Sequence, residues 1–326
     1  MAIEFFTGFE GCGATADVLS LIDYGPQCTY SATSGFNNGK CLRITPTTTG
    51  SCGVICTPAL TKVAGWHIRG AKTQIRSTGY STEPLCIFKG PEISIYNIPT
   101  GFIIYKSGTL ATVVTTPGSS GLTHVEIKLY SHISAGTVQI KINGNLVADV
   151  SGLNTSGAAI NQVYICPTNT DVYIDNIFIA DDWQGELTSY LLKPTSDVTS
   201  DFTPSTGSDN YAMVDDDAED GDTTYVESST VGHKDLYGYE DAPTNIDIKA
   251  VSIVTVMKEV DPGDRFVRHI ANQDATEYDL TSFGLGSVYP QAVSLGLSEI
   301  LNTCPDTTAW TPTKLNAISF GFEIVS

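Results

Sequence analysis

The feature that most constrains the fold is the segment 121–182, where short runs of alternating apolar and polar residues follow one another. Residues 125–130 and 138–142 place every second side chain on one face, which is the pattern of strands that bury a single face. Asn143-Gly144 follows the second run directly. Both residues accept the positive φ of a type I′ turn, so residues 145–150 are predicted to fold back as the next antiparallel strand.

Length and composition favour two β domains. The chain has 326 residues, more than one core of typical size, since domains commonly have about 100–150 residues. Only 16% of the residues are charged, and Thr, Ser, Gly and Val are abundant, which suits pleated sheets better than helices. We expect an all-β chain with a first domain at 1–182, a connector at 183–196 and a second β-rich, sandwich-like domain at 197–326.

Motifs in both halves of the chain together resemble one known family. The first half contains Phe5-Phe-Thr-Gly-Phe-Glu10, Thr123-His-Val-Glu-Ile-Lys128, Val138-Gln-Ile-Lys-Ile-Asn-Gly144 and Asp171-Val-Tyr-Ile-Asp-Asn-Ile-Phe-Ile-Ala-Asp-Asp182. This order resembles the concanavalin A/laminin G-type jelly roll of tailed-phage virion proteins. Further motifs between 183 and 322 resemble the second module that often follows it. The chain departs from the family pattern at Thr123-His124, where an aromatic residue is common, and at Asp175-Asn176, where two aspartates are common.

The resemblance implies a structural component of a phage particle that is made in the host cytoplasm and resides in the virion. We expect a head decoration protein or a neck or collar accessory, which would bind capsid, neck or like subunits and stabilise the particle as a multimer. The alternative is a glycan-binding, lectin-like tail or fibre protein that recognises the host surface. Fold alone does not decide between them, because jelly rolls serve as lectins, enzymes and building blocks.

The charge balance excludes several partners. The formal net charge is −19, with 17 lysines and arginines, whereas nucleic-acid binding needs clustered cations to neutralise phosphates. No stretch approaches the roughly 20 apolar residues of a membrane-spanning helix. The first residues lack the basic region and long apolar run of a secretory signal. We therefore expect no nucleic-acid or membrane partner.

Eight cysteines raise the question of disulfides. Six of them lie close together near the N-terminus, and the full set is Cys12, Cys28, Cys41, Cys52, Cys56, Cys86, Cys166 and Cys304. Zinc binding is disfavoured, because Cys52 and Cys56 have no second closely spaced Cys or His pair beside them. Buried free thiols are one interpretation. The other is that disulfides form after the particle leaves a reducing cell for an oxidising medium.

An acidic run at 215–222 is the candidate for a cation site. With Asp216 as the first ligand, Asp220 and Glu227 fall where a calcium-binding loop needs them. Ala218 removes one ligand, however, and no flanking helices are predicted. A solvated turn between strands is the preferred interpretation, so we expect no cofactor, with calcium at these three carboxylates as the alternative.

No catalytic signature is present. Jelly-roll glycosidases of the laminarinase kind carry a strand-borne Glu-x-Asp-x-x-Glu, which supplies the paired carboxylates of sugar hydrolysis, and this chain lacks it. It also lacks Gly-x-Ser-x-Gly, and its five histidines show no recognisable spacing to Ser or Cys. The sequence therefore predicts a protein that is not an enzyme. Aromatic residues such as Tyr225, Tyr237, Tyr239 and Trp310 remain candidates for sugar stacking or interfaces, with the core or an interface favoured for Trp66 and Trp310.

Overall fold

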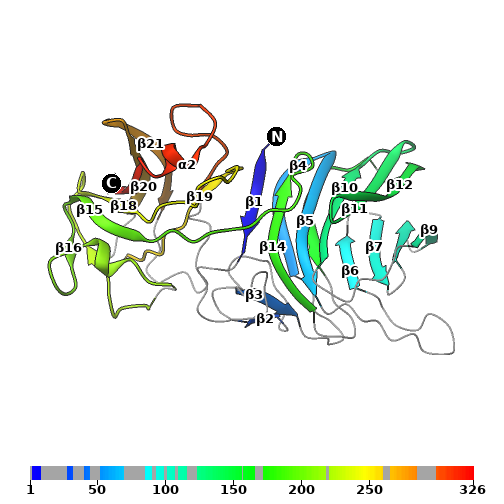
Figure 1. The fold of residues 1–326 in the computed structure, drawn as a ribbon, viewed down its shortest axis with the longest axis horizontal. Helices are drawn as coiled ribbons and strands as arrows, with labels where there is room; N and C mark the ends of the chain where they lie inside the picture. The colour runs from blue at the N-terminus through cyan, green and yellow to red at the C-terminus, as the bar shows by residue number, and fades with distance from the viewer. Residues whose placement is uncertain are drawn as a thin grey trace. The chain divides into compact units, whose positions relative to one another are not determined.

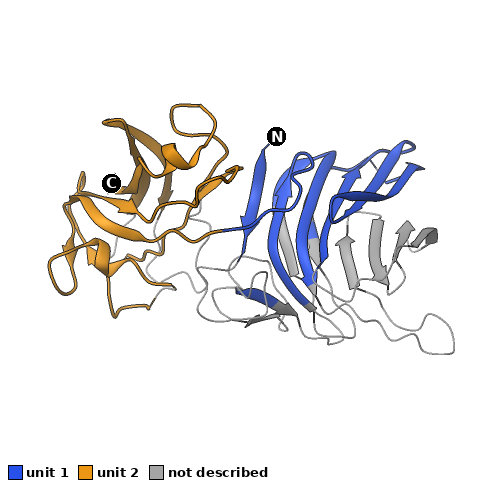
Figure 2. Cartoon of the chain, viewed as in Figure 1, with its two compact units in different colours: residues 1–10, 21–189 blue, residues 11–20, 190–326 orange. Residues whose placement is uncertain are grey.

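The structure is a computed structural model with two compact units, residues 1–10 and 21–189 and residues 11–20 and 190–326 (Figure 2). The division between residues 189 and 190 falls inside the connector expected at 183–196. The structure describes residues 2–8, 28–31, 40–44, 52–69, 85–89, 93–98, 101–106, 109–115, 123–155, 157–165, 172–217, 220–259, 265–284 and 299–326.

The N-terminal unit is built from strands (Figure 1). They are β1 (Ile3–Thr7), β2 (Cys28–Ser31), β3 (Cys41–Ile44), β4 (Cys52–Ala59), β5 (Thr61–Arg69), β6 (Leu85–Lys89), β7 (Ile93–Ile98), β8 (Gly101–Lys106), β9 (Thr109–Thr115), β10 (Thr123–Tyr130), β11 (Gly136–Ile142), β12 (Asn145–Leu153), β13 (Ile160–Ile165) and β14 (Val172–Ala180).

An eight-stranded antiparallel sheet dominates this unit. Its order is β12-β11-β10-β5-β14-β3-β2, with β1 also paired to β14. The long strands β5 and β14 run side by side at its centre (Figure 1). Strands β13 and β4 form a two-stranded sheet, and β6 to β9 form a four-stranded meander. Strand β13 also lies near β6 and β5.

The alternation read from the sequence separates the two faces of the large sheet. Val125, Ile127 and Leu129 on β10 are almost fully buried, as is Trp66, which lies directly opposite Val125 on β5. Each large apolar side chain removed from water stabilises the fold by about 1.5–3 kcal/mol. This face therefore forms the core of the unit, which agrees with the preference for a core position at Trp66.

The predicted hairpin is confirmed. Asn143 and Gly144 both have positive φ, of 46° and 79°, and Ile142 pairs with Asn145 across the turn. The Asn143 side chain also accepts a hydrogen bond from the backbone N–H of His124, at 2.9 Å. The turn is thus tied to the neighbouring strand β10, which holds its register.

The C-terminal unit is also β-rich. It contains β15 (Pro194–Ser200), β16 (Thr203–Pro204), β17 (Val226–Glu227), β18 (Lys234–Tyr239), β19 (Val251–Ile253), β20 (Phe266–Gln273), β21 (Thr276–Gly284), β22 (Glu299–Leu301) and β23 (Ser319–Ile324), with a short 3₁₀ turn at Tyr211–Met213 and one helical turn, α2 (Pro312–Leu315). A five-stranded sheet has the order β15-β18-β23-β20-β21, and β16-β17 and β19-β22 form two small sheets. Nearly every described element is a strand, so the expected all-β fold class is confirmed.

Close backbone packing limits the choice of residue at the centre of the five-stranded sheet. A Cβ atom at Gly321 would lie 1.8 Å from the backbone oxygen of Asp235 on the neighbouring strand. The Asp235 side chain is fully buried and accepts hydrogen bonds from Tyr237 Oη at 2.8 Å, Asn210 Nδ2 at 2.7 Å and the Phe202 N–H at 3.0 Å. This satisfied network ties β18 to the segment before it, which is the usual role of a buried carboxylate with several donors.

The structure shows no disulfide among the cysteines whose side chains it describes, which agrees with the buried-thiol interpretation for them. Cys41, Cys56 and Cys304 are buried and carry thiols. Burial raises the pKa of the Cys56 and Cys304 thiols, and their Sγ atoms lie near the backbone oxygens of Ile160 and Ala309. They thus behave as small buried hydrophobes. Cys12 and Cys166 lie outside the described residues, as do the side chains of Cys28, Cys52 and Cys86.

In the described part of the chain, no helix has the length and apolar character needed to cross a membrane.

Candidate functional site

The second face of the large sheet is polar. Here His124, Glu126 and Lys128 alternate with the apolar residues of β10, and His67 lies directly opposite His124 on β5. Lys141 on β11 lies directly opposite Glu126. We call this side of the sheet, which these five residues define, the polar face. His67, His124 and Glu126 on it are nevertheless buried, so something covers them.

The cover is the segment 181–189, which we call the strap. Asp181 exchanges hydrogen bonds with Ala2, and the strap then meets β10, where Lys128 Nζ lies 2.6 Å from Asp182 Oδ1. The backbone N–H groups of Gln184 and Gly185 then both donate to Glu126 Oε1, each at 3.0 Å. A buried carboxylate costs free energy unless it accepts hydrogen bonds. Glu126 therefore holds the strap, and the strap in turn satisfies Glu126 Oε1, whereas Oε2 has no hydrogen-bond partner among the described residues.

The strap continues across β5 to β14. Glu186 Oε1 lies 3.1 Å from His67 Nε2, and Ser189 donates from both its N–H and its hydroxyl to Asn176 Oδ1, at 3.0 and 3.1 Å. A Cβ atom at Gly8 would lie 1.6 Å from Ser189 Oγ, so this glycine leaves room for the end of the strap. The strap thus crosses the sheet through polar contacts at successive strands.

Asn176 reaches the strap because β14 is irregular there. The pairing of β14 with β5 shifts register between Asp175 and Phe178, and Asn176 adopts the left-handed conformation with φ of 49°. Asparagine tolerates this region better than most residues. Where the family pattern commonly has a second aspartate, this chain therefore has an amide whose oxygen accepts from Ser189 and whose Nδ2 lies 3.4 Å from His67 Nδ1.

Two imidazoles lie together under the strap. The ring centroids of His67 and His124 are 5.1 Å apart, and His124 also stacks on Phe178 at 6.4 Å. Burial lowers the pKa of His67, although Glu186 opposes that shift. Burial and the neighbouring His67 lower the pKa of His124 to about 4. Both rings are therefore neutral near pH 7, and both nitrogens of His124 lack a hydrogen-bond partner among the described residues.

Beyond the strap, the polar face is open to solvent. Lys128 on β10 lies opposite Gln139 on β11, and Gln139 lies opposite Asp149 on β12. These side chains are partly or fully exposed. The half-buried Trp183 lies beside them, with its ring centroid 4.1 Å from Lys141 Nζ and 5.8 Å from Lys128 Nζ. We call the set of Lys128, Gln139, Lys141, Asp149 and Trp183 the open end of the polar face.

Asp182 anchors the backbone at Trp183. Its Oδ1 accepts from Lys128 Nζ and from the Trp183 N–H, at 2.6 and 2.9 Å. The hydrogen bond from Lys128, followed by that from the Trp183 backbone, lowers the pKa of this carboxyl. Asp182 is therefore ionised near neutral pH. The open end thus combines an aromatic ring, two ammonium groups and hydrogen-bonding side chains.

The predicted calcium ligands are only partly brought together. Thr224 Oγ1 lies 2.9 Å from Asp220 Oδ2 and 3.3 Å from Asp216 Oδ2, and partial burial and repulsion from Asp220 raise the pKa of Asp216. Glu227 lies on β17, paired with Thr203. Within the residues that the structure describes, these three carboxylates do not converge within reach of one cation. The contacts agree with a turn closed by Thr224.

In another acidic cluster, each carboxylate already has a cationic partner. Oxygens of Glu277, Asp279 and Glu323 come within 4.8 Å of one another. Arg268 pairs with Asp279 and Glu323, each at 2.5 Å, and Lys234 pairs with Glu277 at 2.6 Å. The two cations occupy the carboxylates, so this cluster is a surface ion-pair network of the five-stranded sheet.

A hydroxyl, an imidazole and a carboxylate also meet in the C-terminal unit. Thr255 Oγ1 lies 2.9 Å from His269 Nε2, but His269 Nδ1 is 3.9 Å from Glu299 Oε2, too far for a hydrogen bond. Both Glu299 oxygens instead accept from Thr281, one from its N–H and the other from its hydroxyl. The arrangement does not form the relay that activates a hydroxyl nucleophile.

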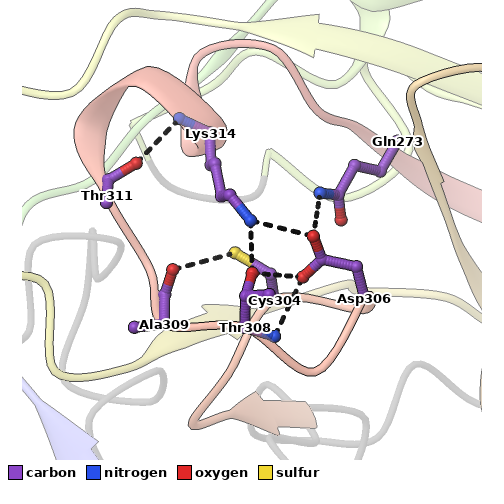
Figure 3. A network of polar contacts seen from close by, with 7 residues as sticks. All are labelled: Gln273, Cys304, Asp306, Thr308, Ala309, Thr311 and Lys314. Atoms are coloured by element: carbon purple, nitrogen blue, oxygen red, sulfur yellow. Dashed lines mark hydrogen bonds and ion pairs between the residues drawn. The ribbon is translucent and has the colours of Figure 1, made fainter.

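The network around Asp306 serves the fold (Figure 3). Asp306 Oδ2 accepts from Gln273 Nε2 at 3.0 Å and Lys314 Nζ at 2.8 Å, while Oδ1 accepts from the N–H of Thr308. The hydrogen bond from Lys314 is the largest cause that lowers the pKa of this carboxyl. Thr311 caps α2 by accepting from the Lys314 N–H at 3.2 Å. These bonds join β20, the loop after β22 and α2. The polar face of the N-terminal unit thus remains the candidate site.

Comparisons with known proteins give a likeness in fold. No protein-family model and no curated protein sequence matches the chain. Among similar solved structures are a mutant of alginate lyase Aly36B with alginate trisaccharide (14% identity, TM-score 0.30, 44% of this chain and 82% of that chain), basic winged bean lectin with Tn-antigen (9%, 0.33, 54% and 97%) and a Bacillus licheniformis β-glucanase (9%, 0.34, 56% and 100%). At such identities the likeness concerns the fold alone.

One expectation needs correction here. The sequence predicts a protein that is not an enzyme, but similar structures include an alginate lyase and a β-glucanase as well as a lectin. The exclusion of enzymes was therefore wrong. It depended on the absence of a few known motifs, and a fold does not by itself determine whether a protein is an enzyme.

The open end was missed by sequence reasoning. In the sequence, Glu126 is only one polar position of an alternating strand, and Trp183 falls at the start of the expected connector. The available signal was the row of polar residues at every second position of β10, His124, Glu126 and Lys128, which marks the face of an antiparallel strand that does not join the apolar core. Such a row predicts that this face is covered by polar partners or exposed for binding.

The bonds from the strap to Glu126 predict the effect of removing that carboxylate. We expect Glu126→Ala to leave the Gln184 and Gly185 N–H groups without their acceptor and to destabilise the strap by about 1–3 kcal/mol. Hydrogen exchange should then become faster at these two amides. Glu126→Gln keeps an acceptor oxygen and is the matched control. Unchanged exchange in Glu126→Ala would show that the strap is held by other contacts.

The buried imidazoles predict a dependence of stability on pH. Because the pKa of His124 is lowered to about 4 in the folded state, the folded protein binds fewer protons than the unfolded chain. Stability is then fully present above about pH 6.5 and is lost as the pH falls toward 4, by about 3 kcal/mol for this residue. His124→Asn should flatten the dependence of the urea unfolding free energy on pH in that window. Parallel curves for the two proteins would refute the assignment.

Proposed function

We propose that the N-terminal unit binds glycans at the open end of its polar face. The observation that carries the proposal is the half-buried Trp183 ring, held beside the exposed or half-buried Lys128, Gln139, Lys141 and Asp149. Small-molecule sites combine apolar or aromatic surface with a few placed polar groups. A sugar matches both features. Its C–H face packs on an aromatic ring, and its hydroxyls accept and donate hydrogen bonds.

The fixed geometry of the open end favours binding. The backbone at Trp183 is held by the bond from its N–H to Asp182, and the next two strap amides are held by Glu126. The Trp183 ring itself lies against the ammonium groups of Lys141 and Lys128. A side chain that is already positioned loses little freedom when a ligand arrives, so more of the contact energy becomes affinity. The buried Glu126 thus holds the strap segment that carries Trp183.

Replacing the aromatic ring tests the proposal. We expect Trp183→Ala to weaken binding of the glycans that the wild-type protein captures on a glycan array by about tenfold or more, because an aromatic anchor commonly contributes 2 kcal/mol or more. Phe266→Ala is the control, since it removes an exposed aromatic ring from the C-terminal unit. Equal binding by wild type and Trp183→Ala would place any glycan site elsewhere, and absence of binding by wild type would overturn the proposal.

We further propose that the chain works on the surface of a phage particle. The order of motifs in both halves, which resembles tailed-phage virion proteins, supports this location. Glycan binding favours a place on a tail or fibre. A head decoration or a neck or collar accessory, bound to capsid, neck or like subunits, is the other placement that the motifs support.

Quantitative protein composition of purified particles distinguishes these placements. We expect a small fixed copy number relative to the major capsid protein, as a tail, fibre or neck component would show. Comparable abundance would instead indicate a shell decoration. Absence from particles would overturn the virion location, and it would leave the glycan-binding proposal to be judged by the array.

A further inference from the structure

Lys141 differs from most lysines of this protein in lacking a carboxylate partner. Lys62, Lys128, Lys193, Lys234, Lys249, Lys258 and Lys314 each form an ion pair. Among the described residues, Lys141 Nζ forms no ion pair and instead lies over the Trp183 ring, 4.1 Å from its centroid. In a chain with a net charge of −19, an ammonium group that forms no ion pair is uncommon.

The carboxylates near Lys141 are bonded to other groups or lie farther along the sheet. Asp182 is bonded to Lys128 at 2.6 Å and also interacts with the charge of Lys141, so two ammonium groups share one strap carboxylate. Glu126 lies opposite Lys141, but its Oε1 accepts from the strap amides. Asp149 forms no ion pair with either lysine in the described structure and lies beyond Gln139 on the edge strand. Lys141 Nζ therefore lies beside Trp183 with N–H donors that form no ion pair with a described carboxylate.

We infer that the open end selects acidic sugars, that is, glycans carrying a carboxylate or sulfate group. The inference rests on the proposed glycan binding and adds the ligand class. The sugar ring would lie against Trp183, and its anionic group would accept a charge-assisted hydrogen bond from Lys141. A cation above an aromatic ring keeps N–H donors directed away from the ring. Lys141 is thus placed beside the sugar-binding surface and free to bind an anion.

The test compares charged and uncharged forms of one sugar. Isothermal titration with oligogalacturonate, its methyl ester and a sulfated galactan oligosaccharide separates charge from sugar identity. We expect the wild-type protein to bind at least one acidic probe roughly tenfold more tightly than the neutral ester, with a preference that falls as salt is raised. Lys141→Gln should remove the preference, and Lys141→Arg should retain it.

Arg265→Gln is the matched control, because it removes one positive charge from a residue of the C-terminal unit that forms no ion pair among the described residues. If it abolishes the preference as Lys141→Gln does, overall charge and not the site is responsible, and the inference fails. Equal affinity for the acidic and neutral probes overturns the inference and leaves glycan binding intact. A preference that survives Lys141→Gln overturns the assignment to Lys141. If the array and the titrations detect no sugar at all, both proposals fail.

Discussion

The acceptance of two strap amides by the buried Glu126 carboxylate is the interaction on which the candidate site depends. Without a cover, the polar face would be an ordinary solvated side of an antiparallel sheet. With the strap in place, His67, His124 and Glu126 are removed from water, and each needs compensation. The strap supplies part of that compensation, through its two bonds to Glu126 Oε1 and its contact with His67. These bonds set the path of the strap and the place of Trp183 on the polar face.

The two units use buried or paired charges for different purposes. In the C-terminal unit the carboxylates of Asp235 and Asp306 are satisfied by several donors and join segments of the fold, and each carboxylate of the cluster around Arg268 is paired with Arg268 or Lys234. In the N-terminal unit, Lys141 remains without a carboxylate partner among the described residues. A binding site is more readily recognised by such an incomplete set of interactions than by the number of charged residues, since satisfied networks have little left to offer a ligand.

Sequence reasoning succeeded where structure is local and failed where it is not. The alternation at 125–130 and the Asn143-Gly144 turn depend on neighbours in the chain, so strands and hairpin were predictable. The bond from Gln184 to Glu126 joins residues 58 positions apart, and the His67–His124 pair depends on the register of β5 against β10. Neither follows from spacing. The state of the cysteines was not predictable either, because clustering along the sequence does not tell whether thiols meet in space; Cys41, Cys56 and Cys304 carry thiols in the structure.

The strap is attached to Glu126 through backbone N–H groups and not through side chains. Any residue except proline offers the same donor. Positions 184 and 185 can therefore accept many substitutions while the path of the chain persists, although Gly185 has a φ of 78° that favours glycine. A lineage under pressure to change its target could thus vary the side chains at the open end without rebuilding the sheet. The side chains that contact a ligand could then change while the sheet and the backbone path of the strap stay the same.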